Sequence, residues 1–418
     1  MEKSNIMNKR TSLVFLLAVT SLGYFVDAYD LLVFSVGRNA SIIDLGLAQT
    51  EAQIKAIGIT LENWQSLGLL LGGIFWGVLG DRIGRMKILY GSIALYSIAN
   101  LLNGLLNPNF GNTLVWYSSL RFLSGLGLAG ELGASITLVA EAMKTTKRGL
   151  GTMFVAAIGF LGCVTASFLG GHLGVRWNTL FIIGGIGGLL LLFLRFGVYE
   201  SKLFLIQKDS NVSKGAFFSL FTNLKRFKRF ALSILVGLPV YFVIGLPIKF
   251  ASNFGQAFNI QGVTVATSIM TCYLFVALGD VFCNYLSQLL KSRRIPLLLF
   301  NILNLIAVLL FIFVPPRNAW QYEFIYCPLL GFSVGYWALI VTNAAEQFGT
   351  NLRATVATTV PNFIRSTFIP IALLFSLLES HWGTINSAAI IGVFCSIIGI
   401  ISALLLKESF HNDLNYTE

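Results

Sequence analysis

Long apolar stretches are the feature that most constrains this chain. Stretches of 18 or more predominantly apolar residues recur along its whole length, and each is long enough to cross a bilayer as an α-helix. Only 11% of the residues are charged, against about a quarter in a typical soluble domain. We therefore expect an all-α integral membrane protein with twelve transmembrane helices. The expected spans are residues 12–36, 57–80, 87–106, 113–142, 149–171, 177–195, 230–252, 263–290, 295–314, 323–346, 353–378 and 387–406.

Lysine and arginine are distributed unevenly over the segments between these spans. Of the 29 Lys and Arg residues, 21 fall in segments on the side of both termini and four on the opposite side, while four more fall inside spans. Cytoplasmic loops of membrane proteins carry an excess of Lys and Arg, so both termini are expected in the cytoplasm. The same bias accounts for the net charge of +11, and no nucleic-acid partner is needed to explain it.

The sequence gives no sign of catalytic chemistry. The five cysteines lie scattered within spans, without the spacing of metal ligands, and the three histidines are dispersed. No catalytic triad and no glycine-rich phosphate loop can be found. We expect neither a metal nor a cofactor, and we expect that the chain is not an enzyme.

A polar stretch at residues 200–229 separates six expected spans from six. It predicts an N-terminal bundle (residues 1–199), a cytoplasmic interdomain loop and a C-terminal bundle (residues 230–418). A parallel repeat of six helices suggests two rigid, pseudo-symmetric bundles that rock around a central site, which is a transporter's architecture. Three features recur at offsets of 205 to 208 residues. Glu141 and Arg148 are matched by Glu346 and Arg353, Glu200 is matched by Glu408, and Arg85-x-Lys87 is matched by Lys291-x-Arg293.

The segment GVLGDRIGRMK joins the second span to the third. Gly77 allows close helix packing, Gly84 allows a tight turn, and Asp81 at a helix end can accept hydrogen bonds from backbone N–H groups. Arg82 and Arg85 belong on the cytoplasmic surface. The segment resembles the loop signature of the major facilitator superfamily, G-x-x-x-D-R-x-G-R-x-K.

Other stretches resemble the same family. RFLSGLGLAGELGAS (121–135) resembles the fourth-span signature of its proton-coupled members, and YFVDAYDLLVFS (24–35) resembles the first span of its phosphate, metabolite and sugar proton symporters. VYESKLF (198–204) resembles their sixth-span exit. The resemblance covers the whole chain. It implies two six-helix bundles, a substrate site between them, and a monomer that suffices for function.

Some departures narrow the resemblance. In the second copy of the loop signature, Ser287 stands where Asp81 stands in the first. The seventh span, ALSILVGLPVYFVIGLPIK, lacks the glutamines typical of sugar porters. The fifth span, AAIGFLGCVTASFLGG, lacks the Gly-Pro pair typical of antiporters. We therefore favour neither sugar transport nor drug export.

Few ionisable residues lie deep inside the expected spans. Asp27, Glu131 and Arg365 fall near the midplane, while Asp30 is nearly one turn from Asp27 and Arg121 is further out on the span of Glu131. Charged groups at this depth cost roughly a few kcal/mol each, so they are functional candidates. We expect the three acids, with Arg121 as their partner, to carry a coupled proton. The alternative is a structural Asp–Arg pair between spans 1 and 4.

The two halves differ at these positions. Tyr336 stands opposite Glu131 at the 205-residue offset, and Arg365 has a planar fork that suits a carboxylate or phosphate. Glu62, near the outer end of its span, is expected to be in water. The residues expected to bind substrate are Arg365, Asn362, Asn343, Tyr336 and Gln65.

A further group of charged residues lies at the cytoplasmic ends of spans. We expect a charge network that latches the two bundles when the site faces outward. Together with the loop signature, the residues expected in this gate are Gly77, Asp81, Arg82, Gly84, Arg85, Glu141, Arg148, Glu346 and Arg353.

The sequence as a whole favours a proton-coupled secondary transporter that imports a small anionic solute across a cell inner membrane by alternating access. A carboxylate, an amino acid, a phosphate compound and a carboxylate siderophore all stay open as the solute. The expected partners are this solute, protons and the lipid bilayer. The alternative is an exporter of the same fold for a metabolite, siderophore or drug. A membrane enzyme, receptor or channel fits less well, because neither a catalytic constellation nor a sizeable extramembrane domain is present.

Overall fold

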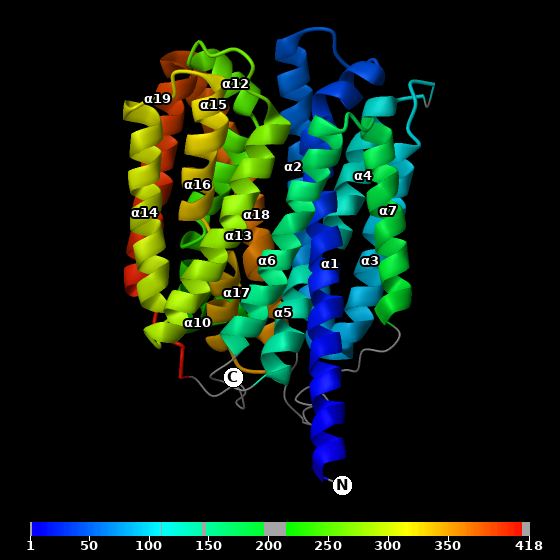
Figure 1. Ribbon diagram of the computed structural model, residues 1–418, viewed down its shortest axis with the longest axis vertical. Coiled ribbons are helices and arrows are strands. Elements are labelled where there is room, and N and C mark those ends of the chain that lie inside the picture. The colour runs from blue at the N-terminus through cyan, green and yellow to red at the C-terminus, as the bar shows by residue number, and fades with distance from the viewer. Residues whose placement is uncertain (1, 110, 144–147, 196–214, 412–418) are drawn as a thin grey trace.

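The computed structural model describes residues 2–109, 111–143, 148–195 and 215–411. These residues form helices and short connections, without a β-strand among them. Figure 1 shows the helices running along the long axis of the molecule. The first half of the chain forms α1 (Glu2–Asp44), α2 (Glu51–Ile83), α3 (Arg85–Gly104), α4 (Thr113–Leu128), α5 (Glu131–Ala142), α6 (Arg148–Ser167), η1 (Phe168–His172) and α7 (Trp177–Leu194). The second half forms α9 (Ser219–Thr222), α10 (Leu224–Leu235), α11 (Leu238–Val243), η3 (Ile244–Ile248), α12 (Ala251–Ala257), α13 (Val265–Leu289), α14 (Arg294–Phe313), α15 (Ala319–Gln321), η4 (Tyr322–Tyr326), α16 (Cys327–Ser333), α17 (Trp337–Glu346), α18 (Arg353–Ser366) and α19 (Phe368–Leu405).

The described residues cross a membrane twelve times. Ten stretches among them are long and apolar enough to span one. The last stretch, residues 353–405, covers two crossings, because the backbone leaves the helical region at Gly383 (φ +76°) and turns back. α3, which is richer in polar residues, supplies the remaining crossing. The expected all-α fold with twelve transmembrane helices is confirmed.

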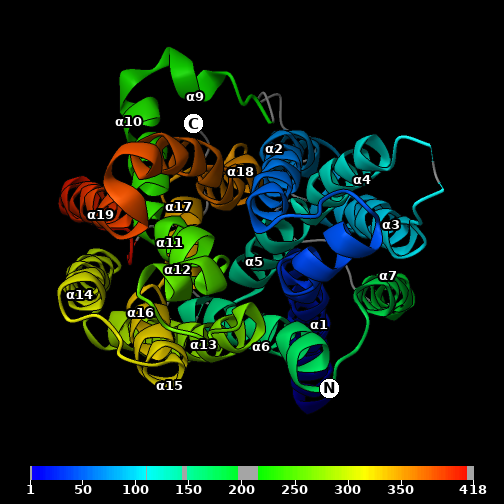
Figure 2. The same ribbon diagram turned by 90° about the horizontal axis from the view of Figure 1, so that it is seen from above.

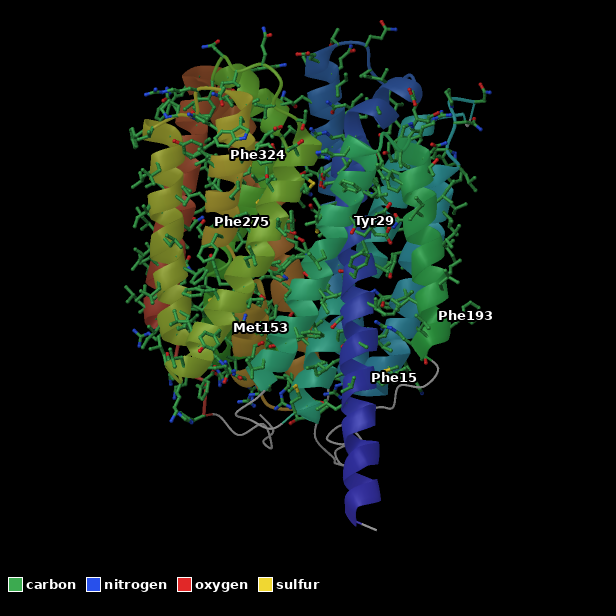
Figure 3. All side chains as sticks on the ribbon, viewed as in Figure 1. Phe15, Tyr29, Met153, Phe193, Phe275 and Phe324 are labelled. Carbon is green, nitrogen blue, oxygen red and sulfur yellow. The ribbon has the colours of Figure 1, made fainter. Side chains whose placement is uncertain are left out.

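Large apolar side chains cover the sides of the molecule. Figure 3 labels Phe193 and Phe324, which point outward from α7 and η4 and are 70% and 46% exposed. A soluble protein rarely exposes an apolar surface this extensive, whereas lipid chains are a suitable neighbour for it. The chain is therefore a multi-pass membrane protein.

Two groups of helices lie side by side. Figure 2 shows α1 to α7 in one group and α10 to α19 in the other, and we call these groups the N-bundle and the C-bundle. They meet where α2 and α5 pack against α18 and where α6 packs against α13. The α2–α3 turn after Asp81 marks one end of the molecule, and the start of α2 near Lys55 marks the other. We call these the Asp81 end and the Lys55 end.

Matching breaks interrupt one span in each bundle. The fourth span is divided between α4 and α5 after Ala129, and the tenth span is divided between α16 and α17 after Val334. These two positions are 205 residues apart, which is the offset of the sequence repeat. A helix break leaves backbone carbonyl and N–H groups without their usual partners, so both breaks place hydrogen-bonding groups deep inside the molecule.

The segment between the bundles is more helical than expected. Residues 200–229 were expected to form a loop, and residues 200–214 lie outside the described part of the chain. Of the remainder, Ser219–Thr222 form α9, and α10 begins at Leu224 rather than at 230. Asn223 starts α10 by accepting a hydrogen bond from the N–H of Lys225 (2.9 Å). A side-chain cap of this kind allows a helix to begin in polar sequence, where hydrophobicity alone predicts a loop.

A glycine lets the bundles touch at the middle of the molecule. Gly133 of α5 faces α18 so closely that an added Cβ atom would lie 2.3 Å from Thr358 Oγ1 and 2.4 Å from Thr358 Cα. No side chain fits there unless the two bundles separate.

We expect Gly133→Ala to lower the stability of this closed arrangement by about 1–3 kcal/mol, the usual cost of overpacking. Thermal unfolding of the purified protein measures the effect. The control is Gly187→Ala, where the nearest atom would be 3.9 Å from the new Cβ. Equal melting temperatures for the two variants would show that the bundles do not depend on this close approach.

Candidate functional site

A cavity lies between the two bundles near the middle of the molecule. Its volume is about 20 Å³, which is room for one or two water molecules, so the site is collapsed rather than open. Aromatic rings dominate the lining, and Arg365 is its one cation. The lining residues are Tyr24, Ala28, Leu31, Phe160, Cys163, Val240, Tyr241, Ile244, Tyr273, Val276, Trp337 and Arg365.

Arg365 and Asp27 face each other across the bundles at this cavity. Arg365 Nη2 of α18 lies 3.9 Å from Asp27 Oδ2 of α1, and both residues are almost fully buried. Arg365 also donates to Asn362 Oδ1 (3.4 Å), and its guanidinium lies 5.6 Å from the centre of the Trp337 ring. The Asp27 oxygens accept no hydrogen bond from the described residues. The pair is close enough for charge neutralisation but too long for a tight hydrogen-bonded bridge.

Glu131 has a different partner from the one expected. It begins α5 directly after the break in the fourth span, where the helix N-terminus favours a carboxylate. Arg195, at the end of α7, forms its ion pair, and Ser135 donates a hydrogen bond to it (2.9 Å). Gly23 of α1 makes room for this pair, since an added Cβ would meet atoms of both side chains. Arg195 is one of the four Lys and Arg residues inside the expected spans, and spacing along the chain did not predict its pair with Glu131.

Arg121 lies apart from Glu131 and donates a hydrogen bond to a neutral side chain instead. It donates to Gln65 Oε1 of α2, and its guanidinium lies 4.5 Å from the centre of the Phe34 ring. Asp30 is an electrostatic neighbour of Arg121 rather than an ion-pair partner, and its carboxylate packs against Gly184 of α7. The expected partnership of Arg121 with the three acids is therefore not seen as direct contact in this conformation.

The other expected substrate residues lie outside the cavity lining. Asn362 donates to the backbone oxygen of Ala129 (2.8 Å), at the break in the fourth span, and so joins the bundles. Asn343 accepts a hydrogen bond from Gln347, one turn further along. Tyr336 points into the C-bundle, where its hydroxyl donates to the backbone oxygen of Val236 (3.2 Å), because the break after Val334 turns it away from the cavity.

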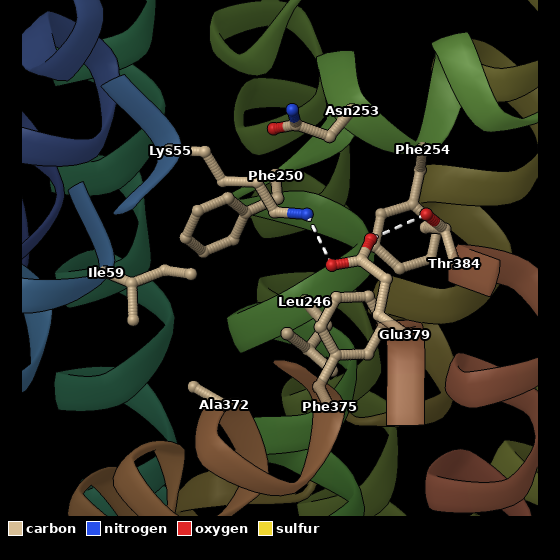
Figure 4. Close-up of a pocket in the computed structure, with 10 residues that line it drawn as sticks. All are labelled: Lys55, Ile59, Leu246, Phe250, Asn253, Phe254, Ala372, Phe375, Glu379 and Thr384. Carbon is tan, nitrogen blue, oxygen red and sulfur yellow. Dashed lines mark hydrogen bonds and ion pairs between the residues drawn. The ribbon is translucent and has the colours of Figure 1, made fainter. Parts of the chain in front are cut away.

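The Lys55 end of the cavity is closed by two ion pairs between the bundles. Lys249 Nζ lies 2.8 Å from Glu62 Oε2, and Lys55 Nζ lies 2.6 Å from Glu379 Oε2. Figure 4 shows the second pair above the ring of Phe375 and beside the ring of Phe250. Glu62 was expected in water, but it is only 2% exposed, because Lys249 of the other bundle covers it. A lysine inside the seventh span was the one sequence signal for this contact.

At the Asp81 end, Asp81 caps a helix of the opposite bundle. Its carboxylate accepts hydrogen bonds from the backbone N–H groups of Ala354 (3.1 Å) and Thr355 (2.8 Å), at the start of α18, and from the Thr355 hydroxyl (2.7 Å). An added Cβ on Gly77 would lie 3.0 Å from the Thr355 oxygen, so the glycine permits this approach. Gly84 has φ +110°, a left-handed conformation that favours glycine, and it turns the chain from α2 into α3.

Two crossed ion pairs join the bundles beside Asp81. Glu141 pairs with Arg353 (3.3 Å), and Glu346 pairs with Arg148 (2.8 Å), so each glutamate reaches the arginine of the other repeat. Arg82 is exposed and lies outside these pairs.

Each glutamate also has an arginine of its own bundle. Arg85 lies 3.1 Å from Glu141, and Arg293 lies 2.9 Å from Glu346. The structural counterpart of Arg85 is therefore Arg293 rather than Lys291, because four residues connect α13 to α14 whereas one residue connects α2 to α3. The network has the approximate two-fold symmetry of the repeat.

Glu408 ties the end of the last span to this network. Burial raises its pKa, but hydrogen bonds from the Arg293 N–H (2.8 Å) and from the Ser292 hydroxyl hold the pKa below its ordinary value. Its repeat counterpart, Glu200, lies outside the described residues.

We expect Arg353→Ala to destabilise the protein by about 1–3 kcal/mol, because it removes the partner of the buried Glu141 from the other bundle while Arg85 of the same bundle stays. Lys87→Ala, which removes an exposed cation at the same end, is the matched control and should change stability little. Thermal unfolding compares the two. Similar melting temperatures would contradict the role of the crossed pair in holding the bundles together.

Comparison with known proteins gives a consistent result. The family model described as Major Facilitator Superfamily matches residues 20–372. A probable 4-methylmuconolactone transporter of Cupriavidus pinatubonensis is 27% identical, over 93% of this chain and 89% of its own. The cis,cis-muconate transport protein of Acinetobacter baylyi is 26% identical, over 97% of each chain.

The fold has a solved counterpart. The proton:xylose symporter XylE superposes with a TM-score of 0.72, covering 97% of this chain and 98% of its own at 16% identity. At that identity the likeness concerns the fold. The family match covers most of the chain, and the relatives with similar sequences are transporters rather than enzymes. The chain belongs to the Major Facilitator Superfamily of membrane transporters.

Proposed function

We propose that this chain is a proton-coupled importer of a small organic anion, which it moves by alternating access. The contact between Asp27 and Arg365 carries this proposal. A buried carboxylate and a buried guanidinium lie 3.9 Å apart, one on each bundle, at the cavity between them. The packing of helices around the cavity does not require charged side chains at this position, and each charge alone would be costly to bury.

The pair provides a way to couple a proton to an anion. An arginine stays charged in a protein, so Arg365 always needs a negative partner. Without substrate, ionised Asp27 is that partner. When Asp27 takes up a proton, the guanidinium becomes available to the carboxylate of a solute, which it can bind through two parallel hydrogen bonds. The net charge of the closed cavity is the same in the empty and the loaded site. The site can therefore change the side of the membrane that it faces in either form, without a buried unpaired charge.

This exchange favours symport over antiport. Ionised Asp27 competes with the solute for Arg365. The solute anion therefore binds together with the proton that neutralises Asp27. By thermodynamic linkage, the proton then raises the affinity for the anion, and the anion raises the affinity for the proton. An inward proton gradient would therefore drive uptake. An exporter of the antiport type needs the opposite relation, in which proton and solute exclude each other.

The lining of the cavity supports a planar, unsaturated or aromatic carboxylate. Tyr24, Phe160, Tyr241, Tyr273 and Trp337 supply flat apolar faces, and Arg365 supplies the one cation. Rings of this kind stack on a planar solute and add specificity beyond the buried area. The named cargoes of two relatives, cis,cis-muconate and 4-methylmuconolactone, are similar in chemical class.

The excess of Lys and Arg at the Asp81 end supports an orientation with that end in the cytoplasm, at a cell inner membrane. The crossed ion pairs then form the inner gate, and Lys249 with Glu62 closes the outer side. We retain Asp30 and Glu131 as further carboxyls on the proton's route. We retain Arg121 as the cation near Asp30.

Asp27→Asn mimics the protonated acid, and it should separate binding from coupling. In proteoliposomes with an inward proton gradient, we expect the variant to lose accumulation of cis,cis-muconate or nicotinate but to keep exchange of labelled for unlabelled solute. Arg365→Ala should lose both. Asp44→Asn, which changes an exposed acid at the end of α1, is the control. Proton-driven accumulation by Asp27→Asn equal to that of the wild type would contradict the proposal.

Trp337→Ala should weaken the binding of a planar aromatic carboxylate such as nicotinate by about threefold to tenfold, because a stacking partner is lost. The binding of propionate, which has no ring, should change little. Titration calorimetry measures both solutes. Trp320→Ala, which removes an exposed indole of α15, is the matched control. An equal loss for nicotinate and propionate would show that the indole only supports the fold.

A further inference from the structure

Buried cations gather on the outer side of the cavity, separate from Arg365. They are Arg38, Arg121 and Lys249, which are 2%, 0% and 6% exposed. One carboxylate, Glu62, lies among them as an ion-pair partner or electrostatic neighbour of all three. Even when Asp30 is counted beside Arg121, the cations outnumber the carboxylates. A buried excess of positive charge is unfavourable unless an anion joins it.

Glu62 is held between the two bundles. Its Oε1 accepts a hydrogen bond from Ser35 of α1 (2.8 Å), and its Oε2 accepts one from Lys249, directly after η3 (2.8 Å). Ser35 and Glu62 belong to the N-bundle, whereas Lys249 belongs to the C-bundle. Separation of the bundles at this end therefore takes Lys249 away from its carboxylate.

Arg121 keeps free hydrogen-bonding capacity. One of its nitrogens donates to Gln65, and its guanidinium lies 4.5 Å from the centre of the Phe34 ring. Its Nε and Nη1 atoms have no hydrogen-bond partner among the described residues, nor does Gln65 Nε2. A fully buried guanidinium with two unsatisfied donors is a ready site for an oxygen anion.

Arg38 shows the same pattern nearer the entrance. Its guanidinium lies 4.2 Å from the centre of the Phe250 ring in the C-bundle, and its Nη1 has no hydrogen-bond partner among the described residues. Gly58 of α2 makes room for the side chain, since an added Cβ would lie 2.7 Å from Arg38 Cδ. Gly58 thus accommodates a buried cation that has no carboxylate within ion-pair distance in the described part of the chain.

The cluster lies directly outward of the substrate cavity. Lys249 follows η3, whose first residue, Ile244, lines the cavity. Two further lining residues lie within electrostatic range of the cluster: Tyr241 is near Glu62, and Cys163 is near Lys249. A solute that enters from the Lys55 end must pass these groups before it reaches Arg365.

We propose that Lys249, Arg121 and Arg38 form an outer anion-binding station for the carboxylate of the incoming solute. While the outer side is closed, the carboxylate of Glu62 occupies this station in place of the solute carboxylate. When the bundles separate at the Lys55 end, the carboxylate of the solute takes the place of Glu62 beside Lys249. It then passes inward to Arg365. The transfer to Arg365 rests on the proposed function, whereas the station itself requires only that an anion can bind.

Bromide, a simple anion, tests whether the station binds anions without any assumption about the transported solute. The purified protein is melted in increasing sodium bromide, with strongly hydrated fluoride keeping the ionic strength constant. We expect bromide to stabilise the wild type weakly, because Glu62 competes with it. Glu62→Gln removes this competitor and should lower the apparent dissociation constant for bromide by about tenfold, within the usual range of coupling between two sites.

Three further variants complete the test. The double variant Glu62→Gln with Lys249→Met removes both charges of the pair, so that no unpaired carboxylate is left to unfold the protein, and it should lose the bromide response. Arg365→Ala should keep the response, because it changes a different site. Arg176→Ala, which removes an exposed cation at the same end, should match the wild type.

Two results would overturn the station. One is a bromide response that is the same in the wild type, Glu62→Gln and the double variant. The other is a response that Arg365→Ala abolishes and the double variant preserves, because the anion site would then be the central one alone. A failure of Asp27 and Arg365 to couple proton and solute would leave the bromide results unaffected, so the two proposals fail separately.

Discussion

The positive charge of Arg365 constrains how the two bundles can meet. It lies at the cavity between two bundles, and a charge at this depth in a membrane must have a partner. Asp27 supplies one from the other bundle, at a distance that neutralises the charge without a tight hydrogen bond. We propose that this interaction draws the bundles together, that a proton removes it and that a solute carboxylate restores it.

Both ends of the molecule use the same physical means of closure. At the Asp81 end a carboxylate of α2 caps α18, and the crossed pairs of Glu141 with Arg353 and Glu346 with Arg148 connect the bundles. At the Lys55 end the pair of Lys249 and Glu62 does so. Ion pairs suit a reversible gate, because water replaces each lost contact when the gate opens, and the separated charges are then solvated. The shared pattern fits a conformation in which the cavity is closed on both sides.

Much of the fold could be predicted from the sequence. Long apolar stretches allow only a helical membrane protein, and the offset of 205 residues reappears as the distance between the breaks at Ala129 and Val334. The sequence repeat also singled out Glu141, Arg148, Glu346 and Arg353. It did not reveal that the pairs cross between the bundles, because spacing along the chain does not say which surfaces meet.

The site was harder to predict for the same reason. The depth of a residue follows from its position in a span, so Asp27 and Arg365 could be placed near the same level. The direction of a side chain depends on helix rotation and on helix breaks. Arg195 rather than Arg121 therefore meets Glu131, and Tyr336 points into its own bundle. Glu62 appeared to be near water, because the lysine that covers it lies 187 residues away in the chain.

The central claim is that Asp27 and the solute carboxylate alternate as partners of Arg365. Its most direct test is to count protons taken up when an anion binds to the purified protein. Calorimetric titrations with nicotinate in buffers of different ionisation enthalpy give this number. We predict close to one proton taken up per anion bound by the wild type, above the pH at which nicotinate itself protonates, and none by Asp27→Asn. Anion binding by the wild type without proton uptake, or with proton release, would contradict it.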